Sequence, residues 1–131
     1  MERKIMSLIL VIDADAKVRS TLNQRLALFA YAVIDAADSR MGIRLFQERR
    51  PELVIVDILV PSMEGLQCIQ ELRAIHASVP IIATSASTTV GGLDVLELAG
   101  RFGANRALQK PLDTAKLLAA VREELASSKA A

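Results

Sequence analysis

Five short apolar segments alternate with five segments of helical periodicity along the 131-residue chain. The apolar segments are near-continuous runs of Val, Ile and Leu, a pattern typical of strands that are buried on both faces. We expect strands at about 5–12, 32–36, 53–57, 80–85 and 105–109. We expect helices at about 16–29, 39–49, 64–77, 93–102 and 113–126. This alternation predicts an α/β fold, a doubly wound five-stranded parallel sheet with right-handed crossovers and helices on both faces.

The first and last expected helices each place their apolar side chains on one face, because these residues are spaced three or four apart. In the first helix they are Val18, Leu22, Leu26 and Phe29. In the last helix they are Leu118, Val121 and Leu125. Asp113 stands where an N-terminal cap of the last helix is expected.

The composition indicates one globular domain. Apolar residues make up 52% of the chain, which excludes a disordered protein, and the net charge of +1 favours neither nucleic acid nor an anionic membrane as partner. No apolar run approaches the roughly 20 residues of a membrane helix. Cys68 has no second cysteine to pair with. We expect a single cytoplasmic domain over 1–131, with a core at about 5–126 and a short tail at 127–131.

Charged side chains follow three of the expected strands. Asp13 follows the first strand, Asp57 closes the third, and Lys110 follows the fifth. Because the carboxyl ends of parallel strands meet at one edge of a sheet, these groups are expected in the crevice where such sheets bind ligands. Two carboxylates and an ammonium in one crevice favour phosphoryl or metal chemistry.

Four segments resemble, in order and spacing, the response-regulator receiver domain. They are Val11-Ile12-Asp13, the Asp-x-x-x-Pro-x-x-x-Gly turn from Asp57 to Gly65, Thr84-Ser85-Ala86, and Lys110-Pro111. The resemblance covers nearly the whole chain. It implies a flavodoxin-like (βα)5 fold and a single-domain regulator similar to those of chemotaxis.

The resemblance also implies a chemistry for these residues. Asp57 would accept a phosphoryl group from a histidine kinase or a phosphotransfer protein, and Lys110 and Ser85 would contact the phosphoryl oxygens. A magnesium ion would be bound by Asp13, Asp57 and the backbone carbonyl of Leu59. The chain would act through contacts with a downstream protein target. It would be no enzyme beyond self-catalysed phosphorylation and dephosphorylation.

Two positions depart from the family pattern. Ala14 stands where receivers usually have a second acidic residue that ligates magnesium directly, so the metal site is expected to be weakened. Asp15 is a possible substitute, but a residue at its position more often caps the following helix. Ala107 stands where the family often has a switching aromatic residue. These departures favour an alternative, a pseudo-receiver that works as an interaction module without phosphorylation.

The stretch from Ser85 to Gly103 is about three residues longer than the common receiver pattern. The helix expected over 93–102 carries Leu93 and Leu96 on one side, and Val95, Leu98 and Phe102 on nearly the opposite side. One side must cover the sheet. The other either contacts a partner, including a second copy of the chain, or is covered by the longer loop. Ser85 is also a candidate cap for this helix.

An enzyme class provides a third interpretation. Asp13-Ala14-Asp15 resembles the Asp-x-Asp pair of haloacid-dehalogenase-like phosphatases, with Asp13 as the nucleophile. No acidic pair follows Lys110 to complete a metal site, and Asp57 would have no role. Of the remaining candidates, His76 is expected to be an ordinary surface histidine and Cys68 a core residue.

Overall fold

The structure of the protein is a computed structural model, which describes residues 6–58, 64–90 and 92–130. One parallel sheet has the strand order β2-β1-β3-β4-β7. Its strands are β1 (Leu8–Ile12), β2 (Ala32–Ala36), β3 (Leu53–Asp57), β4 (Ile81–Ser85) and β7 (Arg106–Gln109). The helices are α1 (Ala16–Leu28), α2 (Ser39–Arg49), α3 (Glu64–Ile75), α4 (Val95–Phe102) and α5 (Thr114–Ala130). The predicted doubly wound α/β fold is confirmed.

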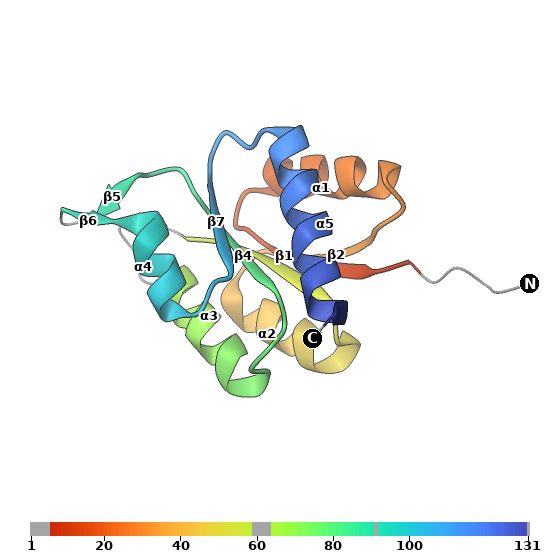
Figure 1. The fold of residues 1–131 in the computed structure, drawn as a ribbon, viewed down its shortest axis with the longest axis horizontal. Coiled ribbons are helices and arrows are strands. Elements are labelled where there is room, and N and C mark those ends of the chain that lie inside the picture. The colour runs from red at the N-terminus through yellow and green to blue at the C-terminus, as the bar shows by residue number, and fades with distance from the viewer. Residues whose placement is uncertain (1–5, 59–63, 91, 131) are drawn as a thin grey trace, which may run out of the picture.

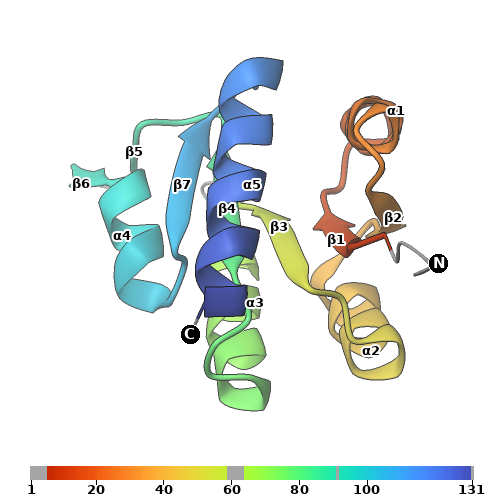
Figure 2. The ribbon, with the colours of Figure 1, turned by 45° about the vertical axis from the view of Figure 1, so that its right-hand side comes forward.

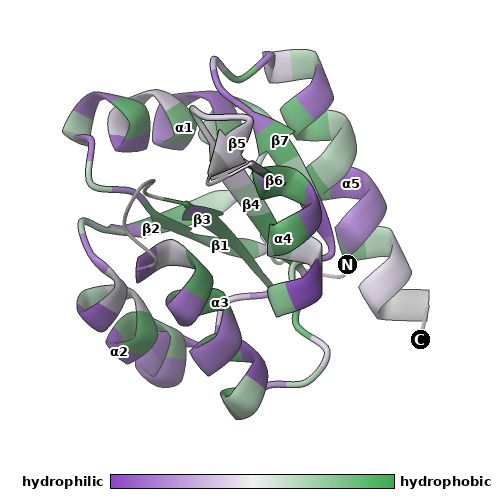
Figure 3. Ribbon diagram, turned by 90° about the vertical axis from the view of Figure 1, so that its left-hand side faces the viewer, coloured by the Kyte–Doolittle hydropathy of each residue, from purple (hydrophilic) through white to green (hydrophobic). Residues whose placement is uncertain are grey.

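The helices form two layers around the sheet (Figures 1 and 2). Helices α1 and α5 cover one face, and α2, α3 and α4 cover the other. Figure 3 shows the hydrophobic strands β1, β3 and β4 between these layers, whereas the helices carry both hydrophobic and hydrophilic residues. This arrangement explains why the strand sequences are apolar throughout, since both of their faces are buried.

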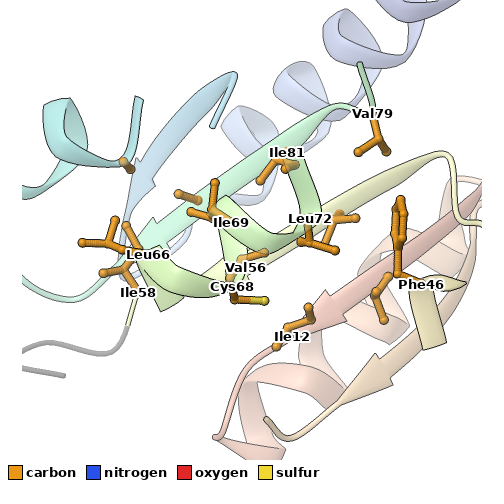
Figure 4. Packing of buried hydrophobic residues seen from close by; sticks show 14 of the residues in the cluster. Ile12, Phe46, Val56, Ile58, Leu66, Cys68, Ile69, Leu72, Val79 and Ile81 are labelled. Carbon is orange, nitrogen blue, oxygen red and sulfur yellow. The ribbon is translucent and has the colours of Figure 1, made fainter. Parts of the chain in front are cut away.

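Each face of the sheet has its own hydrophobic core, because successive side chains of a strand point to opposite faces. On β3, Val56 belongs to the same core as Phe46 of α2 and Leu72 of α3, and all three are labelled in Figure 4. Its neighbour Ile55 packs with Leu26 of α1 on the other side. The two faces of the sheet can therefore be assigned residue by residue.

Most of the expected helix faces are confirmed. Leu22, Leu26, Leu118, Val121 and Leu125 are buried, and Val18 packs against their core. Phe29 is the exception, because α1 ends at Leu28 and the side chain of Phe29 is 48% exposed.

The start and the end of α5 can both be compared with the sequence predictions. Asp113 accepts a hydrogen bond from the backbone N–H of Lys116 at 3.1 Å, as expected of a cap. The helix continues to Ala130, so the prediction of a tail at 127–131 was wrong for residues 127–130. The segment after Pro111 contains no Gly or Pro that would end a helix.

The expected helix over 93–102 begins two residues later. Leu93–Asp94 form the strand β6, which pairs antiparallel with β5 (Thr89–Val90), so the longer segment is folded into a small hairpin. Asp94 caps α4 by accepting hydrogen bonds from Leu96 N and Glu97 N, and this role was wrongly considered for Ser85.

Helix α4 presents two unlike faces. Val95 is buried, and Leu98 and Phe102 pack against the core. Leu93, in the hairpin before the helix, is 58% exposed and Leu96 is half-buried. The hairpin therefore leaves the Leu93 side chain accessible to solvent.

His76 lies at the surface and marks the end of α3. Its Nδ1 accepts hydrogen bonds from Ser78 N at 3.2 Å and Val79 N at 2.9 Å. These bonds stop α3 at Ile75, short of the predicted 77. Cys68 is buried in the core as predicted. Among the described helices, none is both long and apolar enough to cross a membrane.

Candidate functional site

Asp13, Asp57 and Lys110 meet at the carboxyl edge of the sheet. The Lys110 ammonium lies 2.7 Å from Asp13 Oδ2 and 3.0 Å from Asp57 Oδ1, so it bridges the two carboxylates. The side chain of Lys110 is 17% exposed, that of Asp13 is 3% exposed and that of Asp57 is 12% exposed. The juxtaposition expected from the strand ends is therefore present, in a largely desolvated crevice.

The turn after β1 holds Asp13 in place. The Asp13 N–H donates to Ala36 O of β2 at 3.1 Å, and the Asp13 carbonyl accepts a hydrogen bond from the Arg19 guanidinium at 2.8 Å. Asp13 Oδ1 accepts from Asp15 N at 2.8 Å, which leaves Oδ2 directed to Lys110. Contacts from β2 and α1 thus hold the Asp13 backbone, and Asp15 N and the Lys110 ammonium orient its carboxylate.

Asp57 ends β3, and the start of α3 packs directly against its backbone. A Cβ atom at Gly65 would lie 2.4 Å from Asp57 O and 2.8 Å from Ile58 Cα. Only glycine allows α3 to approach this closely. The glycine of the Asp-x-x-x-Pro-x-x-x-Gly turn therefore has a steric reason. Leu59 and Pro61 lie outside the described residues.

Lys110 is attached to β4 as well as to its own strand β7. Its backbone N–H donates to Ser85 O at 2.7 Å, and the Lys110–Pro111 peptide bond is cis. This contact places the Lys110 side chain over the ends of the central strands.

Burial and charge act in opposite directions on the ionisation of the site. Burial raises the pKa of Asp57, and the nearby Asp13 adds to the rise, while Lys110 and Thr84 partly offset it. Burial by itself lowers the pKa of Lys110, but its hydrogen bonds to Asp13 and Asp57 raise that pKa above the ordinary value. Lys110 is thus a cation held between two carboxylates.

Ser85 is fully buried at the end of β4, but its hydroxyl bonds to its own loop. It donates to Ser87 O at 2.8 Å and accepts from Ser87 N at 3.1 Å. Of the predicted hydroxyl and charged residues, Ser85 is therefore the one whose side chain does not join the Asp13–Lys110–Asp57 group.

Sequence reasoning overlooked Thr84. It is 1% exposed, pairs in register with Asp57, and its side chain lowers the pKa of Asp57. Thr84 could have been found from its position one residue before Ser85, near the end of the strand next to that of Asp57. Residues in register on adjacent strands share a face of the sheet.

A small cavity of about 30 Å³ adjoins the carboxylates. Its lining includes Asp13, Ala14, Asp38, Asp57 and Glu64. Ala14 contributes no carboxylate to this lining. Among the described residues, no three His, Cys, Asp or Glu side chains are grouped to hold a metal ion.

Asp15 is a helix cap. Its Oδ1 accepts a hydrogen bond from Lys17 N at 2.8 Å, and the side chain is exposed. Asp15 therefore does not replace the missing acidic residue in the cavity. A magnesium site here would rest on Asp13, Asp57 and backbone or water oxygens, a set that still fits the ion because it often keeps several waters.

The strand order and the charged crevice at the carboxyl edge define a doubly wound α/β protein of the flavodoxin-like type. The sequence profile of the family described as "Response regulator receiver domain" matches residues 9–122. The chain therefore belongs to the receiver domain family of two-component response regulators. Receiver domains are signalling proteins, so the phosphatase interpretation is set aside.

Individual relatives agree with this assignment. A protein named "Response regulator MprA" from Mycolicibacterium vanbaalenii is 35% identical over 118 residues, covering 87% of this chain and 48% of that protein. The "Probable transcriptional regulator ycf27" of Porphyridium aerugineum is 37% identical over 118 residues, covering 89% and 47%. The chain spans about half the length of these curated relatives.

Solved structures show the same fold. A response regulator receiver domain from Clostridium thermocellum superposes with a TM-score of 0.85 at 27% identity, covering 95% of this chain and 98% of that one. A CheY-like receiver domain from Methanospirillum hungatei gives a TM-score of 0.86 at 22% identity, with the same coverage.

Proposed function

We propose that Asp57 is the phosphoacceptor of this receiver domain. The observation that carries the proposal is the Lys110 ammonium, 3.0 Å from Asp57 Oδ1 in a crevice that also holds the Asp13 carboxylate. This cation favours the ionised, nucleophilic form of Asp57 and can neutralise charge on an incoming phosphoryl group.

In the proposed reaction an Asp57 carboxylate oxygen attacks the phosphorus of a phosphohistidine. A P–O bond forms as the P–N bond breaks, and the electron pair of that bond leaves with the histidine nitrogen while the other ring nitrogen carries a proton. The product is an acyl phosphate on Asp57 and a free imidazole on the donor. Lys110 stabilises the equatorial oxygens, and the main task of the protein is to position the reacting groups. Ser85 joins the site only if its hydroxyl leaves Ser87.

The Asp13 and Asp57 carboxylates, with the Leu59 carbonyl as a further donor, would hold a magnesium ion in this crevice. When bound, the ion supplies positive charge to the transferring group. Ala14 removes one carboxylate from the set, so we propose weak magnesium binding with a larger share of water ligands.

We propose that residues 5–126 act as one receiver core in the cytoplasm. A histidine kinase or phosphotransfer protein donates the phosphoryl group, and the signal passes to a protein target. The accessible Leu93 beside α4 supports a contact surface there, including one with a second copy of the chain. The near-zero net charge supports neither nucleic acid nor membrane as partner of this domain.

A second candidate is a receiver that signals without phosphorylation. Two observations favour it: the Ser85 hydroxyl is bonded to Ser87, and Ala107 packs against the core where a switching aromatic residue would stand. In this version Lys110 permanently bridges the two carboxylates and the fold serves as a binding module.

Intact-mass spectrometry after treatment with acetyl phosphate and magnesium separates the candidates. The wild type is expected to gain one phosphoryl group, and Asp57→Asn to gain none. Asp35→Asn, which changes a carboxyl on the edge strand β2 outside the crevice, should be labelled like the wild type. Equal labelling of the wild type and Asp57→Asn would refute the acceptor assignment, and an unlabelled wild type would favour the second candidate.

A further inference from the structure

Thr84 is the side chain on β4 that stands directly beside Asp57. The two residues are register partners in the parallel β3–β4 ladder, and Ile58 N donates to Thr84 O at 2.7 Å next to them. This backbone bond keeps the two strands together up to the last residue of β3. The position of Thr84 relative to Asp57 is thus set by the sheet itself.

The alternation of side chains puts Asp57 and Thr84 on the same face of the sheet. Ile55, two residues before Asp57, packs in the core formed with α1 and α5, and so does Ile82, two residues before Thr84. Side chains two residues apart in a strand share a face. Ser85 lies on the opposite face, because it is two residues after Ala83, which packs on the side of α2, α3 and α4.

The Thr84 hydroxyl is buried with a charged acceptor next to it. Thr84 is 1% exposed, and a buried hydroxyl is hydrogen-bonded in nearly all proteins. The Thr84 side chain acts in the same direction as Lys110, since both lower the pKa of Asp57 against the effect of burial. Asp57 therefore has the Thr84 side chain beside it on β4 and the Lys110 ammonium 3.0 Å from its Oδ1.

We propose that Thr84 is a positioning residue for phosphoryl transfer, and that its hydroxyl, together with the Lys110 ammonium, sets the rotation of the Asp57 carboxylate. This inference rests on the proposed role of Asp57 as acceptor. A carboxylate held by two donors presents its attacking oxygen in one direction, and transfer depends on an in-line approach to phosphorus. Ser85 then has no part in orienting the acceptor before the phosphoryl group arrives.

The test compares Thr84→Val, which removes the hydroxyl at nearly constant volume, with Thr84→Ser, which retains it. At saturating acetyl phosphate with magnesium, Thr84→Val is expected to be labelled about tenfold more slowly, which is the scale of one hydrogen bond to a charged group. The KM for acetyl phosphate should not change, because the donor is not contacted by Thr84. Thr84→Ser should recover most of the rate, and the exposed control Thr89→Val should match the wild type.

A second measurement needs no phosphorylation. The ¹³Cγ resonance of Asp57, recorded at a pH where the carboxyl is ionised, should move in Thr84→Val and return in Thr84→Ser. Wild-type labelling by Thr84→Val, or equal slowing by Thr84→Ser, would overturn the positioning role. If the wild type itself is not labelled, the acceptor proposal fails instead, and an unmoved Asp57 resonance in Thr84→Val then overturns the Thr84 contact independently.

Discussion

The Lys110 ammonium lies 3.0 Å from Asp57 Oδ1, and the same ammonium lies 2.7 Å from Asp13 Oδ2. One cation therefore serves two largely buried carboxylates that come from different strands. This sharing makes the ionisation of the site, its stability and its chemistry depend on each other.

Asp57→Asn is expected to raise the melting temperature at pH 7. Burial raises the pKa of Asp57, and Lys110 and Thr84 offset this rise only in part. A carboxyl whose pKa is higher in the folded state favours folding at low pH, and this contribution is lost as the pH rises through the folded pKa. Because Asn is uncharged, the variant does not lose this stability at pH 7, and we expect its melting temperature to be roughly 2–5 °C higher there. The difference should shrink toward about pH 4, where unfolded Asp titrates.

Calorimetric scans at pH 7 and pH 4 measure both parts of this prediction. Asp35→Asn is the matched control, because its carboxylate is half-exposed and pairs with Arg19 only at 3.8 Å. A lower melting temperature for Asp57→Asn at pH 7 would contradict the sign of the pKa shift.

Lys110→Met should lower the free energy of unfolding at pH 7 by about 2–4 kcal/mol, because it leaves two desolvated carboxylates without their cation. The loss should decrease as the pH falls and the carboxylates become protonated. Urea unfolding at pH 7 and pH 4.5 tests this. The exposed Lys116→Met is the control and should stay within about 0.5 kcal/mol of the wild type.

Ala14→Asp should strengthen magnesium binding by at least about tenfold, since it returns a carboxylate to the cavity that Ala14 lines. Calorimetric titration with magnesium chloride measures the affinity without any phosphodonor. Asp15→Asn should leave the wild-type affinity unchanged, because Asp15 caps α1 and Asn caps equally well. If the affinities of Ala14→Asp and the wild type were equal, the ion would not be bound in this crevice.

Gly65→Ala should destabilise the protein by about 1–3 kcal/mol, because its Cβ would lie 2.4 Å from Asp57 O. We also expect slower labelling by acetyl phosphate, as α3 must move away from the end of β3. Gly100→Ala in α4 meets no atom within 4 Å and should stabilise the protein by about 0.5–1 kcal/mol. Urea unfolding of both variants gives the comparison, and equal effects would show that the Gly65 contact is not tight.

The strand and helix pattern was predictable because it depends on local periodicity. Near-continuous apolar runs such as Leu53–Val56 favour strands that are buried on both faces. The alternation of β and α units then favours a parallel sheet with right-handed crossovers. Element ends were less predictable. The end of α3 depends on the His76 ring accepting bonds from Ser78 and Val79, and the start of α4 depends on the β5–β6 hairpin and the Asp94 cap.

The sequence by itself determined which chemical groups stand at the carboxyl edge: Asp13, Asp57, Ser85 and Lys110 each follow or close a strand. The tertiary structure decided which of them meet. Lys110 joins the two carboxylates, Ser85 bonds to Ser87 instead, and Thr84 takes the place beside Asp57. The physical reason is that strand ends are set by local sequence, whereas register and side-chain direction depend on pairing between strands that are distant in the chain.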